Sequence, residues 1–170
     1  MGVGDMQNWE IRNFKKENYA DVARIYQTGI DGRNATFQKI VPTFEEWNQK
    51  YLHDCRFVVV EDGVTIGWAA LLAFSKMPSY RGVAELSIYI DPEATGKGIG
   101  TALMAHIVEE SEKAGFWTLQ SLIFPENVAS IALHNKFGFK TLCVHEKLGE
   151  MDGIFRDVAL LERRSAIVGK

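Results

Sequence analysis

A glycine-rich segment most constrains how this chain folds. Three glycines fall within residues 96–100, after the apolar stretch 84–90 and before a run to residue 113 whose apolar residues recur at helical spacing. A strand that passes through glycines into a helix offers free backbone amides and the positive end of the helix dipole to a ligand. The sequence therefore predicts a phosphate or pyrophosphate site here. The alternative is a glycine-rich turn that only ends the strand.

Two common nucleotide-binding motifs do not fit this segment. A P-loop requires Gly at position 91 and Ser or Thr after the lysine, but Asp91 stands there and Gly98 follows Lys97. The dinucleotide pattern G-x-G-x-x-G, read from Gly96, puts Thr101 at its last glycine. The phosphate site is therefore expected to be of another kind.

Alternating and helical apolar patterns, separated by turn residues, predict the remaining elements. Strands are expected at residues 9–14, 56–61, 65–74, 84–90, 118–123, 141–148 and 155–161, and helices at 18–32, from 43, 98–113 and 128–137. Asn18 and Thr43 are expected to cap two helices, and Asp62-Gly63 to turn a hairpin. Hairpins come first and strand–helix–strand units later. We therefore expect an α/β (mixed α+β) fold, with a single mixed, largely antiparallel sheet and helices on both faces.

Composition excludes several classes of function. The chain has 170 residues and a net charge of -3, which fits one domain and argues against a general nucleic-acid binder. Cys55 and Cys143 stand alone, so neither a disulfide framework nor a metal site is indicated. Residues 1–7 lack the apolar core of a signal peptide, and the apolar runs are too short to span a membrane. We expect a cytoplasmic protein without membrane, nucleic-acid or metal partners.

A second segment, residues 127–139, also indicates a binding function. Asn127 and His134 are seven residues apart and therefore share one helix face, and Gly138 is a natural helix end. Val128, Ile131 and Ala132 are expected to pack inward. Taken alone, His134 would be an ordinary packing or surface histidine.

Together, the two segments resemble the coenzyme motifs of the GCN5-related N-acetyltransferase superfamily. The pattern R/Q-x-x-G-x-G/A falls on residues 95–100, and N-x-x-(A/S)-x-x-L-(Y/H)-x-x-x-G-F falls on residues 127–139. Over about residues 10–163, the chain more narrowly resembles the phosphinothricin acetyltransferase family. The matching pieces lie at residues 25–26, 35–37, 42–43, 67–69, 80–81, 85–90, 96–100 and 133–134.

This resemblance implies a GNAT-like acyl-CoA N-acyltransferase fold in a single domain, residues 1–170 with a core at about 9–163. It implies acetyl-CoA as co-substrate and a primary amine as acceptor, with direct attack in a ternary complex. The coenzyme-binding residues that it implies are Ile88, Tyr89, Ile90, Thr95, Gly96, Lys97, Gly98, Ile99, Gly100, Thr101, Asn127, Ser130 and His134.

The resemblance also implies residues for catalysis and for the acceptor. Glu85 occupies the position of the family's catalytic carboxylate, which suits a base that takes the proton of the amine. His134 stands where many superfamily members have a tyrosine that acts as general acid. We expect His134 to be either the general acid or a coenzyme contact. Phe37, Tyr80, Arg81 and Glu85 would line the acceptor site.

The chain departs from the family at several charged positions. Thr95 stands where Arg or Gln is usual, and Lys97 could supply the missing charge. Met77 and Ile154 replace arginines that would suit a carboxylate or phosphinate. The cations that remain nearby are Lys76, Arg81 and Arg156. We therefore expect the acceptor to be a small amino-acid-like amine of the phosphinothricin or methionine sulfoximine class.

Several alternatives stay open from the sequence. Glu85 could be a polar residue on the solvent face of its strand, alternating with Ser87. The protein could be a peptide N-terminal acetyltransferase, in which the insertion between residues 29 and 42 would cover the peptide groove. It could also be a non-catalytic acyl-CoA sensor. The resemblance to the family also implies a homodimer.

Overall fold

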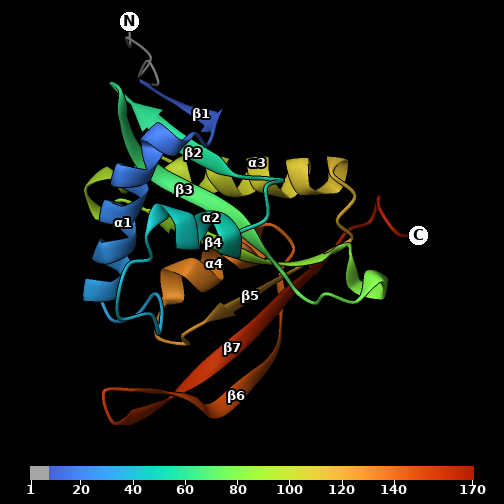
Figure 1. The fold of residues 1–170 in the computed structure, drawn as a ribbon. Coiled ribbons are helices and arrows are strands. Elements are labelled where there is room, and N and C mark those ends of the chain that lie inside the picture. Colours follow the sequence, from blue (N-terminus) through green and yellow to red (C-terminus); the bar gives the residue numbers. More distant parts are fainter. Residues whose placement is uncertain (1–7) are drawn as a thin grey trace, which may run out of the picture.

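The computed structural model describes residues 8–170, and its elements follow the predicted order (Figure 1). The predictions made for residues 1–7 lie outside the described residues. The elements are β1 (Trp9–Asn13), α1 (Tyr19–Asp31), α2 (Phe44–Lys50), β2 (Phe57–Glu61), β3 (Val64–Ala73), β4 (Val83–Ile90), α3 (Ile99–Lys113), β5 (Thr118–Ile123), α4 (Val128–Lys136), β6 (Lys140–Met151) and β7 (Ile154–Arg164). Within residues 8–170, none of the helices is both long and apolar enough to cross a membrane.

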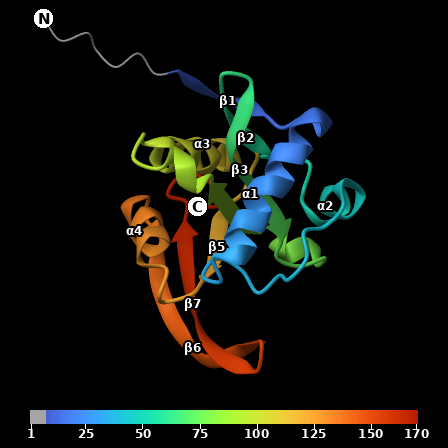
Figure 2. The ribbon, with the colours of Figure 1, turned by 90° about the vertical axis from the view of Figure 1, so that its left-hand side faces the viewer.

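One sheet organises the described chain. Its seven strands run in the order β1-β2-β3-β4-β5-β7-β6, and every neighbouring pair is antiparallel except β4 and β5. Helices α1 and α2 cover one face of the strands, while α3 and α4 cover the other (Figure 2). The predicted mixed, largely antiparallel sheet with helices on both faces is therefore confirmed.

Each face of the sheet has its own core. On the α1/α2 face, Tyr26, Trp47 and Trp68 belong to a buried aromatic cluster. On the α3 face, the core is mainly aliphatic and includes Leu71 and Leu103, neither of which is exposed. Strands β2 and β3 are buried on both sides, which explains why they read as nearly continuous apolar runs.

Local signals set most element ends. Thr43 and Glu46 form a capping box at the start of α2, as the sequence predicts. Asp62 and Gly63 have φ values of 50° and 79°, the left-handed pair of a tight hairpin turn. Asn18 occupies the predicted N-cap position of α1, but its side chain bonds no amide of that helix, because it accepts from the Lys15 amide and donates to Thr65.

The last hairpin is longer than predicted. β6 and β7 extend beyond the body of the sheet (Figure 1), and Asp152-Gly153 turns the chain between them with φ values of 51° and 81°. The sequence underestimates β6 because most of its side chains are exposed on both faces, so no alternation marks its ends.

Helix α4 presents a different face from the predicted one. Val128 and Ala132 are exposed, whereas Ile131 packs against the core and His134 is buried. The prediction for Val128 and Ala132 was wrong. The side of α4 that carries Asn127, Ser130, Ile131 and His134 faces the sheet, because these positions are three or four residues apart.

Candidate active site

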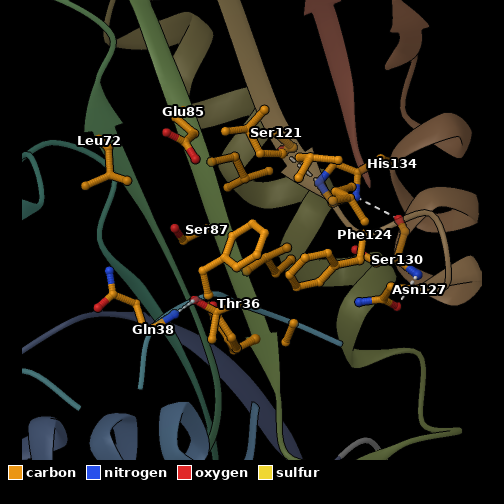
Figure 3. A pocket seen from close by; sticks show the side chains of 18 of the residues that line it. Thr36, Gln38, Leu72, Glu85, Ser87, Ser121, Phe124, Asn127, Ser130 and His134 are labelled. Atoms are coloured by element: carbon orange, nitrogen blue, oxygen red, sulfur yellow. Dashed lines mark hydrogen bonds between the residues drawn. The ribbon is translucent and has the colours of Figure 1, made fainter. Parts of the chain in front are cut away.

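The cavity lies where β4 and β5 part. The two strands pair from Val83–Thr118 to Glu85–Gln120, and no further pairs join them toward Ile90 within the described chain. Beyond this point lies a cavity of about 440 Å³, lined by β4, β5, α4, the segment 35–38, the end of α2 and part of β6. Figure 3 shows Glu85 and Ser87 on one side of this space and His134, Ser130 and Asn127 on the other.

The open edge of β4 leaves backbone groups available to a ligand. Phe74 N donates to Val83 O at 3.3 Å and Asp91 N donates to Ile66 O at 2.9 Å, so the odd-numbered residues of β4 bond toward β3. Successive residues of a strand direct their backbone groups to opposite neighbours. The amides of Ile88 and Ile90 therefore face the gap. Tyr89, for which a backbone contact was predicted, turns its amide toward β3 and contributes its ring to the cavity wall.

Glu85 lies inside the cavity at the point where the strands separate. Its side chain is partly buried opposite Leu72 (Figure 3). Burial raises the pKa of Glu85, and the nearby charge of Lys50 opposes this shift. The carboxyl group of Glu85 is therefore not a fully solvated group on the outer face of its strand, which was the alternative that the sequence left open. A carboxylate with a raised pKa is better suited to accept a proton near neutral pH.

Hydroxyl groups line the wall between Glu85 and α1. Tyr51 Oη donates to Ser87 Oγ at 3.0 Å, and Thr36, Tyr26 and Tyr89 line the same part of the cavity. Burial raises the pKa of each tyrosine, so all three stay neutral hydrogen-bond donors. This wall is therefore polar but uncharged.

His134 is buried and held at both ring nitrogens. Nδ1 lies 2.7 Å from the Ser130 carbonyl and Nε2 lies 2.9 Å from Ser121 Oγ. A carbonyl only accepts, so Nδ1 carries the proton and Nε2 accepts from the serine. Burial lowers the pKa of His134. Its geometry favours a neutral, orienting histidine over the predicted general acid.

The glycine loop has the shape that a pyrophosphate needs. Gly96 and Gly98 have φ values of 83° and 76°, and a methyl group at either would meet no atom within 4 Å. Gly98 caps α3, so open space lies directly before the first amides of that helix. A methyl group at Gly100 would instead lie 3.5 Å from Leu133, which is an ordinary contact, so the packing of α3 on α4 does not require a glycine at this position. Thr95 donates its hydroxyl to Pro92 O.

Lys97 only partly replaces the positive charge that the loop lacks at Thr95. Its ammonium lies 2.9 Å from a carboxylate oxygen of Glu61 on β2. Part of the charge is therefore offset by the protein before any anion binds.

The predicted acceptor residues separate into two groups. Phe37 and Glu85 line the cavity, whereas Tyr80 and Arg81 do not. The ring of Tyr80 packs on Phe74 at 5.2 Å between centroids, and the guanidinium of Arg81 lies 5.3 Å from the centre of the Trp117 ring.

Arg156, which the sequence suggests as a cation for the acceptor, is engaged elsewhere, and Lys50 lies at the cavity instead. Arg156 donates to Arg33 O and to Asn34 Oδ1 and lies 3.2 Å from Glu126, so it ties the segment after α1 to β7. Lys50 lines the cavity, although nothing in its local sequence marks it. It was missed because only the packing of α2 against the sheet brings it there.

Comparison with known proteins identifies the family. A profile of the Acetyltransferase (GNAT) family matches residues 16–139, which is most of the chain. The chain belongs to the GNAT acetyltransferase family. This assignment agrees with the gap between β4 and β5 and with the open glycine loop.

Relatives narrow the group within the family. A Bacillus subtilis (strain 168) protein, provisionally named phosphinothricin acetyltransferase YwnH, is 32% identical over 147 residues, covering 84% of this chain and 90% of that protein. The L-methionine sulfoximine/L-methionine sulfone acetyltransferase of Salmonella typhimurium (strain LT2) is 28% identical over 102 residues, 60% of each protein.

A solved relative contains the coenzyme. The crystal structure of a GNAT superfamily phosphinothricin acetyltransferase from Sinorhizobium meliloti in complex with AcCoA gives a TM-score of 0.83 at 28% identity, covering 93% of this chain and 89% of that chain. Our GNAT protein is thus an acetyl-CoA-dependent N-acetyltransferase of the phosphinothricin acetyltransferase-like group. Within residues 8–170, no three His, Cys, Asp or Glu side chains converge on a metal position.

Proposed function

We propose that this enzyme acetylates the primary amine of a small amino-acid-like molecule, in the phosphinothricin and methionine sulfoximine class, by direct attack in a ternary complex. One observation carries the proposal. The gap between β4 and β5 opens into the same cavity that holds the half-buried carboxyl group of Glu85. A thioester lying along β4 and an amine beside Glu85 would therefore meet in one enclosed space.

The chemistry follows from these groups. The amine is mostly protonated at neutral pH, and only its neutral form attacks a thioester. Glu85 takes this proton, directly or through a water molecule, and the neutral nitrogen then attacks to form the N–C bond. The second proton, which the nitrogen loses as the amide forms, passes to the thiolate or to solvent. Backbone amides at the open edge of β4 stabilise the developing oxyanion. The C–S bond then breaks, and the thiolate, whose conjugate thiol has a pKa near 8.5, leaves without needing a strong acid. In this scheme, His134 orients the site and is not the proton donor.

The coenzyme is proposed to run from β4 to the start of α3. The amides of Ile88 and Ile90 would pair with the pantetheine arm, and the loop 95–101 would hold the pyrophosphate. Asn127, whose side chain also accepts from the Ser130 amide, would contact the arm from α4. The open space beside Gly96 and Gly98 supports this placement because the backbone is accessible there.

We further propose one N-acetyltransferase domain over residues 1–170, with its core at about 9–163, acting as a cytoplasmic homodimer. The second copy is suggested by the last hairpin, where Leu142, Val144, Leu148 and Phe155 are each more than half exposed. Exposed apolar side chains on an edge strand favour association. Light scattering during size-exclusion chromatography would test the dimer.

The direct test is an acceptor panel read by release of free thiol. The purified protein is mixed with acetyl-CoA and with methionine sulfone, methionine sulfoximine, phosphinothricin, a polyamine or a peptide with a free N-terminus. We expect turnover with at least one of the three amino-acid acceptors. Turnover of the peptide alone would indicate a peptide acetyltransferase, and coenzyme binding without any turnover would indicate a sensor. The closure of the cavity by Phe37 favours a small acceptor.

A further inference from the structure

The cavity carries one cation and one carboxylate on its wall. Among the described residues that line it, Lys50 alone is a lysine or arginine, and Glu85 alone is an acid. Lys50 ends α2 and Glu85 lies on β4, so the two charges come from different elements. This pairing depends on the tertiary structure and is invisible in the sequence.

The two charges act on each other without forming an ion pair. Glu85 is the charge that raises the pKa of Lys50, and burial lowers it more strongly. Yet none of the ion pairs within residues 8–170 joins these two side chains. Glu85 is partly buried whereas Lys50 stays exposed, and neither charge is neutralised by direct contact with the other. A molecule with an anionic and a cationic end, placed between them, would compensate both.

The other cations suggested by the sequence are outside the cavity lining. Arg156 is engaged with the segment after α1, and Arg81 packs on Trp117. Lys76 does not line the cavity. Lys50 is thus the group available to an anion of the acceptor.

We infer that Lys50 binds the carboxylate of a zwitterionic acceptor while the amine of the same molecule faces Glu85. This inference rests on the proposed function and names the specificity determinant of that site. The ammonium of Lys50 lies 5.4 Å from the centre of the Tyr51 ring, which stands beside it on the cavity wall. Lys50 supplies the positive charge for the carboxylate that arginines in place of Met77 and Ile154 would otherwise supply.

The test compares acceptors that differ only in the carboxylate. Methionine sulfone and methionine sulfone carboxamide are assayed by thiol release with the native enzyme and with the Lys50→Gln and Lys50→Arg variants. We expect Lys50→Gln to lower kcat/KM for the acid by about 10- to 100-fold, as for a lost charged hydrogen bond, with little change for the amide. Comparing the acid-to-amide ratio between proteins cancels the different basicity of the two amines. Lys50→Arg should retain most of the ratio.

A matched control is available in the same aromatic region. Lys16 lies 5.2 Å from the centre of the Phe44 ring and does not line the cavity, so Lys16→Gln removes a similar cation–ring contact elsewhere. Its acid-to-amide ratio should equal that of the native enzyme. Acetyl-CoA affinity, measured by calorimetry, should be the same in all four proteins.

The outcomes separate this inference from the proposed function. An equal loss for acid and amide in Lys50→Gln would mean that Lys50 acts only through Glu85, and would overturn the inference. No loss for either acceptor would overturn it as well. If no amino acid in the panel is acetylated, the proposed function itself fails. If turnover is found but does not depend on the carboxylate, only the role of Lys50 is lost.

Discussion

The ring of Phe37 lies so close to the backbone of Gly149 that a methyl group on Gly149 would come within 2.3 Å of Cζ. Phe37 belongs to the segment after α1, and Gly149 lies on β6, so the contact joins two parts of the chain that are distant in sequence. Both residues line the cavity. The contact therefore closes one side of the cavity.

Substituting Gly149 should open this side of the cavity. In Gly149→Ala, the new methyl group must displace the Phe37 ring, because the two would otherwise overlap. The backbone of Gly149 is not left-handed, so the substitution adds no backbone strain of its own. We expect the free energy of unfolding to fall by about 1 to 3 kcal/mol, as for overpacking. The acceptor KM should rise while acetyl-CoA affinity stays the same. Chemical denaturation and steady-state kinetics measure these effects.

A double-mutant cycle isolates the cause. In a Phe37→Ala background, the ring that the methyl group meets is gone, so Gly149→Ala should cost little further stability. Additive losses in the double variant would show that the Phe37 contact is not the constraint on Gly149.

The coenzyme loop can be tested at Gly98. Gly98→Ala places a methyl group in the open space before α3, where the pyrophosphate is proposed to bind. Because φ is 76°, the variant should also lose about 1 kcal/mol of stability. We expect the dissociation constant for acetyl-CoA to rise at least several-fold by calorimetry.

Gly115 provides the matched control for this loop. It has a φ of 94° and equally open surroundings at the other end of the same helix. Gly115→Ala should therefore lose comparable stability and keep the native affinity for acetyl-CoA. Equal affinities in the two variants would argue against the loop assignment.

Glu85 should control the pH dependence of turnover. Glu85→Gln keeps the shape of the side chain and removes the base, so turnover at neutral pH should fall about 10²- to 10⁴-fold. Burial raises the pKa of Glu85, so native activity should decline as pH falls through that raised value. The deficit of the variant should shrink at high pH, where solvent deprotonates the amine unaided.

A pH–rate profile of both proteins measures this dependence. Native-like turnover of the variant at neutral pH would exclude Glu85 as the base. Unchanged kcat with a raised acceptor KM would make it a substrate-binding group instead.

His134 should remain neutral across the physiological range. Burial lowers its pKa below the unfolded value of about 6.5. Below that value, the unfolded chain binds more protons than the folded one, so the contribution of His134 to stability is complete above pH 6.5 and is lost as pH falls. Nitrogen-edited NMR should find the proton on Nδ1 and no titration of His134 near pH 6.5. Titration near pH 7 in the acetyl-CoA complex would restore His134 as an acid.

The sequence by itself determined the order of elements and the glycine loop before α3. Thr43, Asp62-Gly63 and the glycines of residues 96–100 act through their own backbone conformations or their nearest neighbours. Such local preferences are readable without the fold. The seven-residue spacing of Asn127 and His134 likewise fixes a shared helix face, and the structure places both residues on the cavity.

Only the tertiary structure decided which groups share the cavity. Lys50 and Glu85 come from a helix end and a strand that meet through packing, and Arg156 is committed to the segment after α1 instead of the acceptor. The sequence also left the protonation of His134 open, since burial and two hydrogen bonds set it. These features depend on contacts between distant residues and on desolvation, which exist only once the sheet and its two layers of helices have assembled.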